Sequence, residues 1–297
     1  MLQPNSLKPG DKIAIICTAR FADKSDIEFA INLLEKWQLQ PVLGDSIGLK
    51  HHQFGGTVAE RAKDLQNQIN NLDVKAIWCA KGGYGTARIL DNIDFSSLLN
   101  HPKWVIGYSD ITALHLQLQY LGCCSLHAQM PVDIQNKSLK TLESLKQSLF
   151  ERPYPIHYTS KFPSQSGQAK GQLIGGNLSV LYSVLGSKAI PNFKDKILFI
   201  EDLDEYLYHI DRMMLNLYGS GILNQLKGLI VGGLSDMNDN SIPFGQTAEE
   251  IIAHYTNKFD MPVAYDCPVG HGFENLALTL GANIELSVNN NDVSIVY

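Results

Sequence analysis

The chain has 297 residues, a formal net charge of −6 and a hydrophobic content of 44%. This composition is ordinary for a folded globular protein of about two domains, so it excludes a disordered chain and a small scaffold that needs disulfide bonds. Lys and Arg form no basic run, which argues against a nucleic-acid surface. A substrate that carries carboxylates would therefore need a local positive site on this acidic protein.

The amino terminus has no basic segment followed by a long apolar run, so it does not read as a secretory signal. No segment reaches the roughly 18 apolar residues that a membrane span requires. The cysteines are odd in number and include no CxxC pair, which favours buried, reduced thiols. We therefore expect a cytoplasmic protein with no membrane association, and a cysteine nucleophile is a minor alternative.

The first half of the chain alternates strand and helix patterns. Capping boxes at Ser25–Glu28 and Thr57–Glu60 predict two helices. Short apolar runs predict buried strands, each followed by a helix, at residues 12–17, 76–80 and 104–108. This alternation predicts a doubly wound, mostly parallel α/β domain over residues 1–150.

The second half has a different pattern. Residues 151–167 contain three prolines and no apolar period, so we predict a linker there. Beyond it, over residues 168–297, two buried strands and a helix are followed by short alternating strands near the carboxyl terminus. We expect a smaller α/β domain that is richer in antiparallel strands.

A serine lies where the third predicted strand turns into a helix, in Val105-Ile106-Gly107-Tyr108-Ser109-Asp110. Parallel sheets bind ligands at this edge, and the free amides of a helix's first turn can stabilise an oxyanion. The simpler interpretation is that Ser109 or Asp110 caps the helix, and the local context alone favours it. The G-x-S-x-G pattern of a nucleophile elbow is incomplete, because Ile111 takes its last position.

A glycine loop, Lys81-Gly82-Gly83-Tyr84-Gly85, also follows a predicted strand. Glycines let backbone amides approach a phosphate or an oxyanion closely. The spacing fits neither a Walker loop nor a dinucleotide fingerprint. A tight turn without a ligand is the alternative.

A serine nucleophile needs a base and a carboxylate that orients the base. His271 lies between two glycines, which leaves its imidazole accessible, and His127 is the second candidate. Glu201 directly follows an apolar strand pattern, and Asp202, Asp204 and Glu205 lie close behind. An acidic helix terminus is the other interpretation of this group. There is no HExxH motif and no compact set of metal ligands.

Six segments, taken in order, resemble the L,D-carboxypeptidase family of serine peptidases: PGDKIAI, CAKGGYGTARIL, GYSDITALH, GQLIGGNLS, ILFIEDLDEYLYHIDRM and VGHGFENLALTLGA. This family includes the muropeptide L,D-carboxypeptidases and the microcin-immunity peptidases. The resemblance implies a triad of Ser109 as nucleophile, Glu201 as acid and His271 as base. It also implies an oxyanion hole formed by the backbone amides around Gly83 and Asp110.

Two positions depart from the family's pattern. Lys81 stands where the family commonly has arginine, so it keeps the charge and loses the planar fork. SLHAQM replaces the more usual LHGPM, which adds a methyl group where the family has glycine. We expect substrate contacts from Lys81, Gly82 and Tyr84.

The resemblance implies hydrolysis of the amide between an L-centre and a terminal D-amino acid, namely D-Ala of a murein tetrapeptide. We expect a peptide-like muropeptide substrate in a cleft between the domains, no metal or organic cofactor, a role in peptidoglycan recycling and a homodimer. One alternative is hydrolysis of a peptidyl- or aminoacyl-nucleotide, as in microcin immunity. A second is a non-catalytic small-ligand binding module, and a third is an α/β-hydrolase esterase, which shares the order Ser, acid, His.

Overall fold

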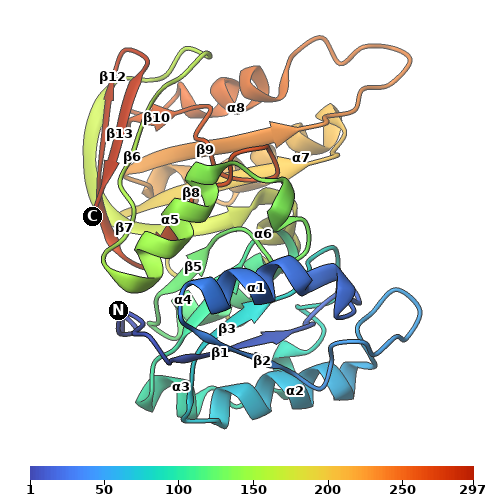
Figure 1. Cartoon of the computed structure of the whole chain (residues 1–297). Helices are drawn as coiled ribbons and strands as arrows, with labels where there is room; N and C mark the ends of the chain where they lie inside the picture. Colours follow the sequence, from blue (N-terminus) through green and yellow to red (C-terminus); the bar gives the residue numbers. More distant parts are fainter.

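The computed structural model describes all 297 residues, and each half of the chain contributes most of one sheet (Figure 1). The first sheet has the strand order β11-β5-β4-β3-β1-β2. Its strands are β1 (Lys12–Ile16), β2 (Gln40–Leu43), β3 (Val74–Cys79), β4 (Trp104–Gly107), β5 (Ser125–His127) and β11 (Leu278–Leu280). Strands β1 to β5 are parallel, and β11 pairs antiparallel with β5. The predicted parallel α/β organisation is confirmed.

Helices cover both faces of this sheet. They are α1 (Glu28–Lys36), α2 (Val58–Asn70), α3 (Ser96–Asn100), α4 (Thr112–Tyr120) and α5 (Leu139–Phe150). Apolar side chains of α1 and α5 pack on one face, and those of α2, α3 and α4 pack on the other. The order 2-1-3-4-5 reverses between β1 and β3, and a crevice forms outside the carboxyl ends of strands at such a point.

The second sheet has the order β10-β9-β8-β7-β12-β13-β6. Its strands are β6 (Ile156–Thr159), β7 (Gly167–Asn177), β8 (Lys196–Leu203), β9 (Gly228–Ser235), β10 (Val263–Ala264), β12 (Asn283–Asn289) and β13 (Asp292–Val296). Strands β7 to β10 are parallel and the other three are antiparallel, as expected for the second half. Apolar side chains of α6 (Leu178–Val184), α7 (Leu207–Gly219) and α8 (Ala248–Thr256) pack together on one face.

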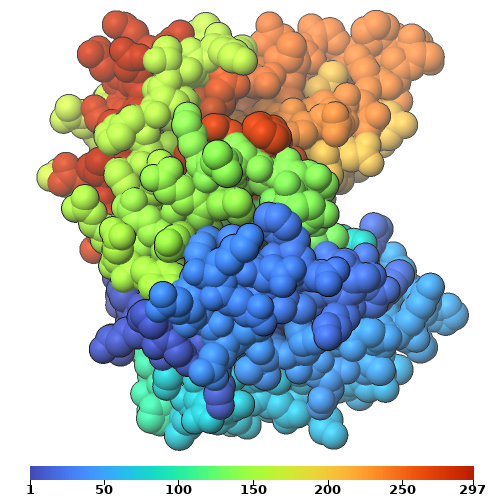
Figure 2. Space-filling model, in the orientation of Figure 1, coloured from blue at the N-terminus to red at the C-terminus, as the bar shows by residue number.

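The two halves share more structure than the predicted boundaries imply. The segment predicted as a linker contains β6, whose Ile156 is buried and whose backbone pairs with β13. Strand β11 belongs to the second half by sequence and completes the first sheet, while Leu278 and Leu280 pack in the second core. Helix α4 also packs on β7 and α6. Figure 2 shows an indentation between the two halves.

Two local predictions are wrong for identifiable reasons. The capping box at Ser25–Glu28 does not form, because the Asp23 carboxylate accepts the N–H groups of Ser25 and Asp26 and supports a short 3-10 turn (Ser25–Ile27). No α-helix follows the glycine loop, and only a 3-10 turn, Leu90–Asn92, is present. The capping box at Thr57–Glu60 is confirmed.

Further 3-10 turns are Ser109–Ile111, Ile134–Asn136 and Leu223–Gln225. None of the helices is both long and apolar enough to span a bilayer.

Candidate active site

Ser109 lies on a sharp turn between β4 and α4. It begins the 3-10 turn Ser109–Ile111, and its φ angle is +61°, in the left-handed region that a serine rarely adopts. No side chain caps this turn, so the helix-cap interpretation of Ser109 is wrong. A strained strand-to-helix turn is the backbone geometry of a nucleophile elbow. Here the turn forms although Ile111 replaces the last glycine of the G-x-S-x-G pattern.

Glu201 and His271 form a buried acid–imidazole pair. Glu201 is completely buried on β8, and its Oε2 lies 2.7 Å from Nδ1 of His271. When the carboxylate accepts a proton held on Nδ1, Nε2 is left free to take a proton from a nucleophile. Gly270 has a φ of +128°, and a Cβ there would lie only 3.0 Å from Glu201 Oε2. A glycine is therefore required beside His271 for the loop to approach the acid.

The pair lies next to the serine turn. The ring of Tyr108, the residue before Ser109, has its centroid 4.9 Å from that of His271. No hydrogen bond joins Ser109 to His271. Catalytic hydrogen bonds are often long in a free enzyme and tighten when substrate binds. The two halves therefore place the serine, the histidine and the glutamate in one region, between the domains.

The glycine loop packs directly against the serine turn. A Cβ built on Gly82 would lie 3.4 Å from Cβ of Ser109 and 3.5 Å from the backbone nitrogen of Asp110. The buried carboxylate of Asp110 accepts the N–H groups of Gly85, at 3.2 Å, and of Thr86, at 2.8 Å. Asp110, the residue after the serine, thus ties the glycine loop to the serine turn.

Arg61 also holds the glycine loop, through a carbonyl oxygen, and the sequence does not predict this role. It lies on α2, is completely buried, and donates to the carbonyl oxygens of Gly85, at 3.0 Å, and of Thr18. Gly85 is therefore held at its N–H by Asp110 and at its C=O by Arg61. An arginine inside a helix pattern gives no sign of this contact.

The loop that carries His271 has two supports that sequence reasoning also missed. Asn275 accepts the N–H of Gly270 at 3.0 Å. The ammonium of Lys137 donates to the carbonyl oxygens of Gly272, at 2.6 Å, and of His271, at 3.3 Å. Lys137 is 134 positions from His271, so no local pattern could reveal this contact.

The other candidates are engaged elsewhere. Among the acids, Asp202 binds Asn177, Asp204 binds Asn238, and Glu205 binds His209. His127 is completely buried, and neither ring nitrogen has a hydrogen-bond partner. Burial lowers the pKa of His127 well below its ordinary value, so its ring is neutral and remote from solvent.

The cysteines are all free and buried, as the sequence predicts. Burial raises the pKa of Cys17 and of Cys79 to about 12. The reactive species is the thiolate, so these thiols are poor nucleophiles at neutral pH. No group of three or more His, Cys, Asp or Glu side chains is arranged to hold a metal ion.

The remaining substrate-contact candidates line the outer side of the glycine loop. Tyr84 is 53% exposed, and its ring centroid lies 6.3 Å from that of Phe54. The ammonium of Lys81 lies 5.9 Å from the centroid of the Phe21 ring. Their contact with a substrate stays a prediction.

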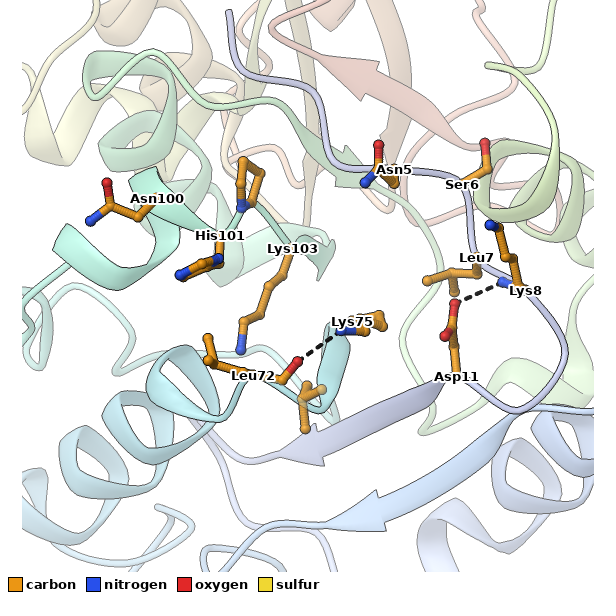
Figure 3. A pocket seen from close by; sticks show the side chains of 12 residues that line it. Asn5, Ser6, Leu7, Lys8, Asp11, Leu72, Lys75, Asn100, His101 and Lys103 are labelled. Carbon is orange, nitrogen blue, oxygen red and sulfur yellow. Dashed lines mark hydrogen bonds between the residues drawn. The ribbon is translucent and has the colours of Figure 1, made fainter.

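A large cavity, of about 790 Å³, lies outside the amino ends of strands of the first sheet, whereas Ser109 follows the carboxyl end of β4 (Figure 3). Its lining includes Asp11, Val74 and Lys103, which lie at the amino ends of β1, β3 and β4. The Lys103 ammonium donates to the carbonyl oxygens of Gln68 and Asn71, at the carboxyl end of α2. It therefore caps a helix, and this cavity is separate from the serine turn.

Family models and related proteins all point to one family. The LD-carboxypeptidase N-terminal domain matches residues 13–128, and the LD-carboxypeptidase C-terminal domain matches residues 170–286. A Bacillus subtilis protein named "Probable murein peptide carboxypeptidase" is 33% identical over 293 residues, which cover 96% of this chain and 91% of that protein. The chain belongs to the LD-carboxypeptidase family. The resemblance inferred from the sequence is confirmed, and the chain is a carboxypeptidase.

Solved structures agree with this family. The muramoyltetrapeptide carboxypeptidase from Oxalobacter formigenes has a TM-score of 0.87 at 27% identity, covering 96% of this chain and 97% of its own. The microcin C7 self-immunity protein MccF, solved in complex with aspartyl sulfamoyl adenosine, has a TM-score of 0.88 at 22% identity. That alignment covers 100% of this chain and 99% of MccF, and it shows a common fold.

Proposed function

We propose that this LD-carboxypeptidase family member hydrolyses the amide between an L-centre and a terminal D-amino acid, with D-Ala of a murein tetrapeptide as its substrate. The observation that carries the proposal is the buried Glu201–His271 pair beside the strained turn of Ser109. A free hydroxyl is a weak nucleophile at neutral pH, and this pair supplies the base that it needs.

In the proposed mechanism, His271 takes the proton from Oγ of Ser109 as the oxygen attacks the scissile carbonyl. Glu201 orients the imidazole and stabilises its cation. Backbone amides at Gly83 and Asp110 bind the oxyanion of the tetrahedral intermediate. His271 then protonates the departing amine of the D-residue. Water, with His271 again as base, releases the acyl group from Ser109.

The preference for a murein peptide is supported by the relatives. The Bacillus subtilis and Oxalobacter formigenes proteins are both named for murein or muramoyl peptides. MccF shares the fold and was solved with aspartyl sulfamoyl adenosine, which keeps a peptidyl- or aminoacyl-nucleotide as the second candidate substrate. Both candidates require acyl transfer to Ser109, and they differ in the acyl group transferred and in the group that leaves.

The test is to incubate the protein with a tetrapeptide that ends in D-Ala, its L-Ala diastereomer and an aminoacyl sulfamoyl adenosine, and to identify the products by mass. Release of D-Ala from the first substrate alone supports the proposal. Ser109→Ala should lower kcat by about 1,000-fold or more. A fluorescent phosphonate should label the wild type and leave Ser109→Ala unlabelled.

Three results would speak against the proposal. Near-normal turnover by Ser109→Ala would exclude Ser109 as nucleophile. A folded wild type that is neither labelled nor active on any of these substrates would instead support a binding module. Rapid hydrolysis of simple esters without a D-residue would support the esterase.

A role in cytoplasmic peptidoglycan recycling follows from the proposed substrate, because D-Ala release from a free tetrapeptide belongs to the reuse of murein fragments. Deletion of the gene should then lead tetrapeptide fragments to accumulate in the cytoplasmic fraction. We also propose a homodimer, which sedimentation equilibrium of the purified chain would test.

A further inference from the structure

Removal of one carboxyl-terminal residue places strict demands on the site, if the proposed function holds. The free carboxylate of the departing residue is separated from the scissile carbonyl carbon only by the amide nitrogen and one Cα. It therefore lies within about 3.8 Å, one residue's length, of the carbon under attack. A cation that recognises this carboxylate must therefore lie beside the glycine loop, which is called the oxyanion loop below because its amides are proposed to bind the oxyanion. The net charge of the protein is −6, so this cation must be a local positive group.

Arg20 lies at this place. It belongs to the loop after β1, at the point where the strand order reverses between β1 and β3. Its backbone N–H donates to the carbonyl oxygen of Gly82 at 3.4 Å. Its side chain lies over Gly83, where a Cβ would fall 2.5 Å from Arg20 Cδ and 2.6 Å from Nε. Arg20 therefore fills the space that Gly83, with a φ of +99°, leaves open.

The guanidinium of Arg20 has no protein partner. The side chain is exposed, makes no hydrogen bond within the chain, and has no acidic group within 4.0 Å. The other arginines near the loop are occupied, because Arg61 is buried against carbonyl oxygens and Arg88 lies over the Phe54 ring. Arg20 thus presents free donors beside the oxyanion loop, and the planar fork of a guanidinium matches a carboxylate.

We propose that Arg20 binds the terminal carboxylate of the substrate and so restricts the enzyme to peptides with a free carboxyl end. The contact with Gly83 sets the position of the cation relative to the oxyanion amides. Arg20 is then a specificity-determining residue, and its role deepens the proposed function without changing the triad.

The experiment compares the D-Ala tetrapeptide as a free acid with the same peptide as a carboxyl-terminal amide. The wild type should prefer the free acid. Arg20→Gln should lower kcat/KM for the acid by roughly 10- to 100-fold, mostly through KM, since a hydrogen bond to a charged group is lost. The value for the amide should change less than about 3-fold, because no charged hydrogen bond is lost there.

Two matched variants sharpen the result. Arg20→Lys keeps the charge without the fork and should recover part of the preference for the acid. Lys50 is an exposed cation over the Phe21 ring, 4.6 Å from its centroid, and does not touch the glycine loop. Lys50→Gln removes the same charge from the same surface and should leave the preference unchanged.

Arg20→Gln with the wild-type preference for the free acid would overturn the assignment. An equal loss on acid and amide would also overturn it, because it would indicate a displaced oxyanion loop. Failure of the proposed function looks different, since the wild type would then release D-Ala from neither peptide.

Discussion

The glycine loop of the first half and the His271 loop of the second half are held by different chemistry. Buried charges hold the first loop, with Asp110 on the N–H of Gly85 and Arg61 on its carbonyl. A neutral amide, Asn275, and a partly exposed ammonium, Lys137, hold the second. A buried charge that loses its partners costs far more than a lost neutral hydrogen bond. The nucleophile side should therefore tolerate substitution less than the base side.

The residues that hold the two loops differ from the groups that are proposed to react. The oxyanion amides must be in place before the reaction, because preorganised donors stabilise charge without moving. In the proposed mechanism the imidazole instead exchanges protons with the nucleophile and the leaving group, and its contact with Glu201 orients it. Substitutions of the supports and of the reacting groups test this division.

The largest effect should come from the base itself. His271→Ala should lower kcat by about 1,000-fold, as should Ser109→Ala, because neither group activates the reaction alone. The double variant should be about as inactive as either single variant. Kinetics on the D-Ala tetrapeptide measure this, and losses that multiply would show that the two residues do not act as a unit.

Glu201→Gln should lower kcat by less than His271→Ala does, because the charge is lost and the shape of the side chain is kept. Oε1 of Glu201 is buried without a hydrogen-bond partner, so the glutamine amide is free to turn its oxygen toward Nδ1 of His271. The loss should appear in kcat and leave KM near its wild-type value. A loss as large as that of His271→Ala would mean that the charge of Glu201 is indispensable.

Asp110→Asn tests the nucleophile side. It keeps the size of the side chain, removes the carboxylate that accepts two N–H groups, and removes a negative charge that acts on Arg61. We expect a loss of about 2 kcal/mol in the free energy of unfolding, from urea titration. A shift of the oxyanion loop by 1 Å would lower kcat by up to about 100-fold. Asp91→Asn, at an exposed acid further along the segment, is the control, and equal behaviour of the two variants would remove the proposed role of Asp110.

The sequence predicts the strands and helices, and the Glu201–His271 contact, better than it predicts the residues that hold the two loops. Strands such as β1 and β4 are read directly from short apolar runs, because both faces of the sheet are buried. Glu201 and His271 are found because each follows a recognisable local pattern, and the structure brings them into contact. Whether they work with Ser109 stays a prediction.

The supports of the two loops are not local, and this explains why they are missed. Arg61 is 24 positions from Gly85 and Lys137 is 135 positions from Gly272, so only the folded chain brings them together. The contact of Asp110 with the Thr86 N–H, 24 positions away, is likewise not visible in the local sequence. The predicted linker likewise contains β6, because a partner strand far along the chain, β13, is needed to reveal it.

The stability of the fold should depend on pH through Asp202, the acid next to Glu201. Burial, and then the charge of Glu201, raises the pKa of Asp202 to about 7 from an ordinary value of 3.8. The folded state thus favours the protonated form, so this contribution to stability is complete below pH 3.8 and is lost as pH rises through 7. Asp202→Asn should be less stable than the wild type at pH 5, and the gap in Tm should narrow toward pH 8. A gap in Tm that is constant from pH 5 to 8 would contradict the raised pKa.

The smallest effect should come from Lys137→Met, on the base side. The ammonium supports two carbonyl oxygens of the His271 loop, while the Glu201 and Asn275 contacts remain. We expect kcat to fall less than about 10-fold, because these two hydrogen bonds are partly exposed to water and the remaining contacts still hold the loop. Lys140→Met, which removes only an exposed contact with Glu274 at 3.7 Å, is the control and should leave kcat unchanged. A loss near 100-fold for Lys137→Met would mean that the base loop depends on a fixed charge as much as the nucleophile loop does, and the contrast between the two halves would not hold.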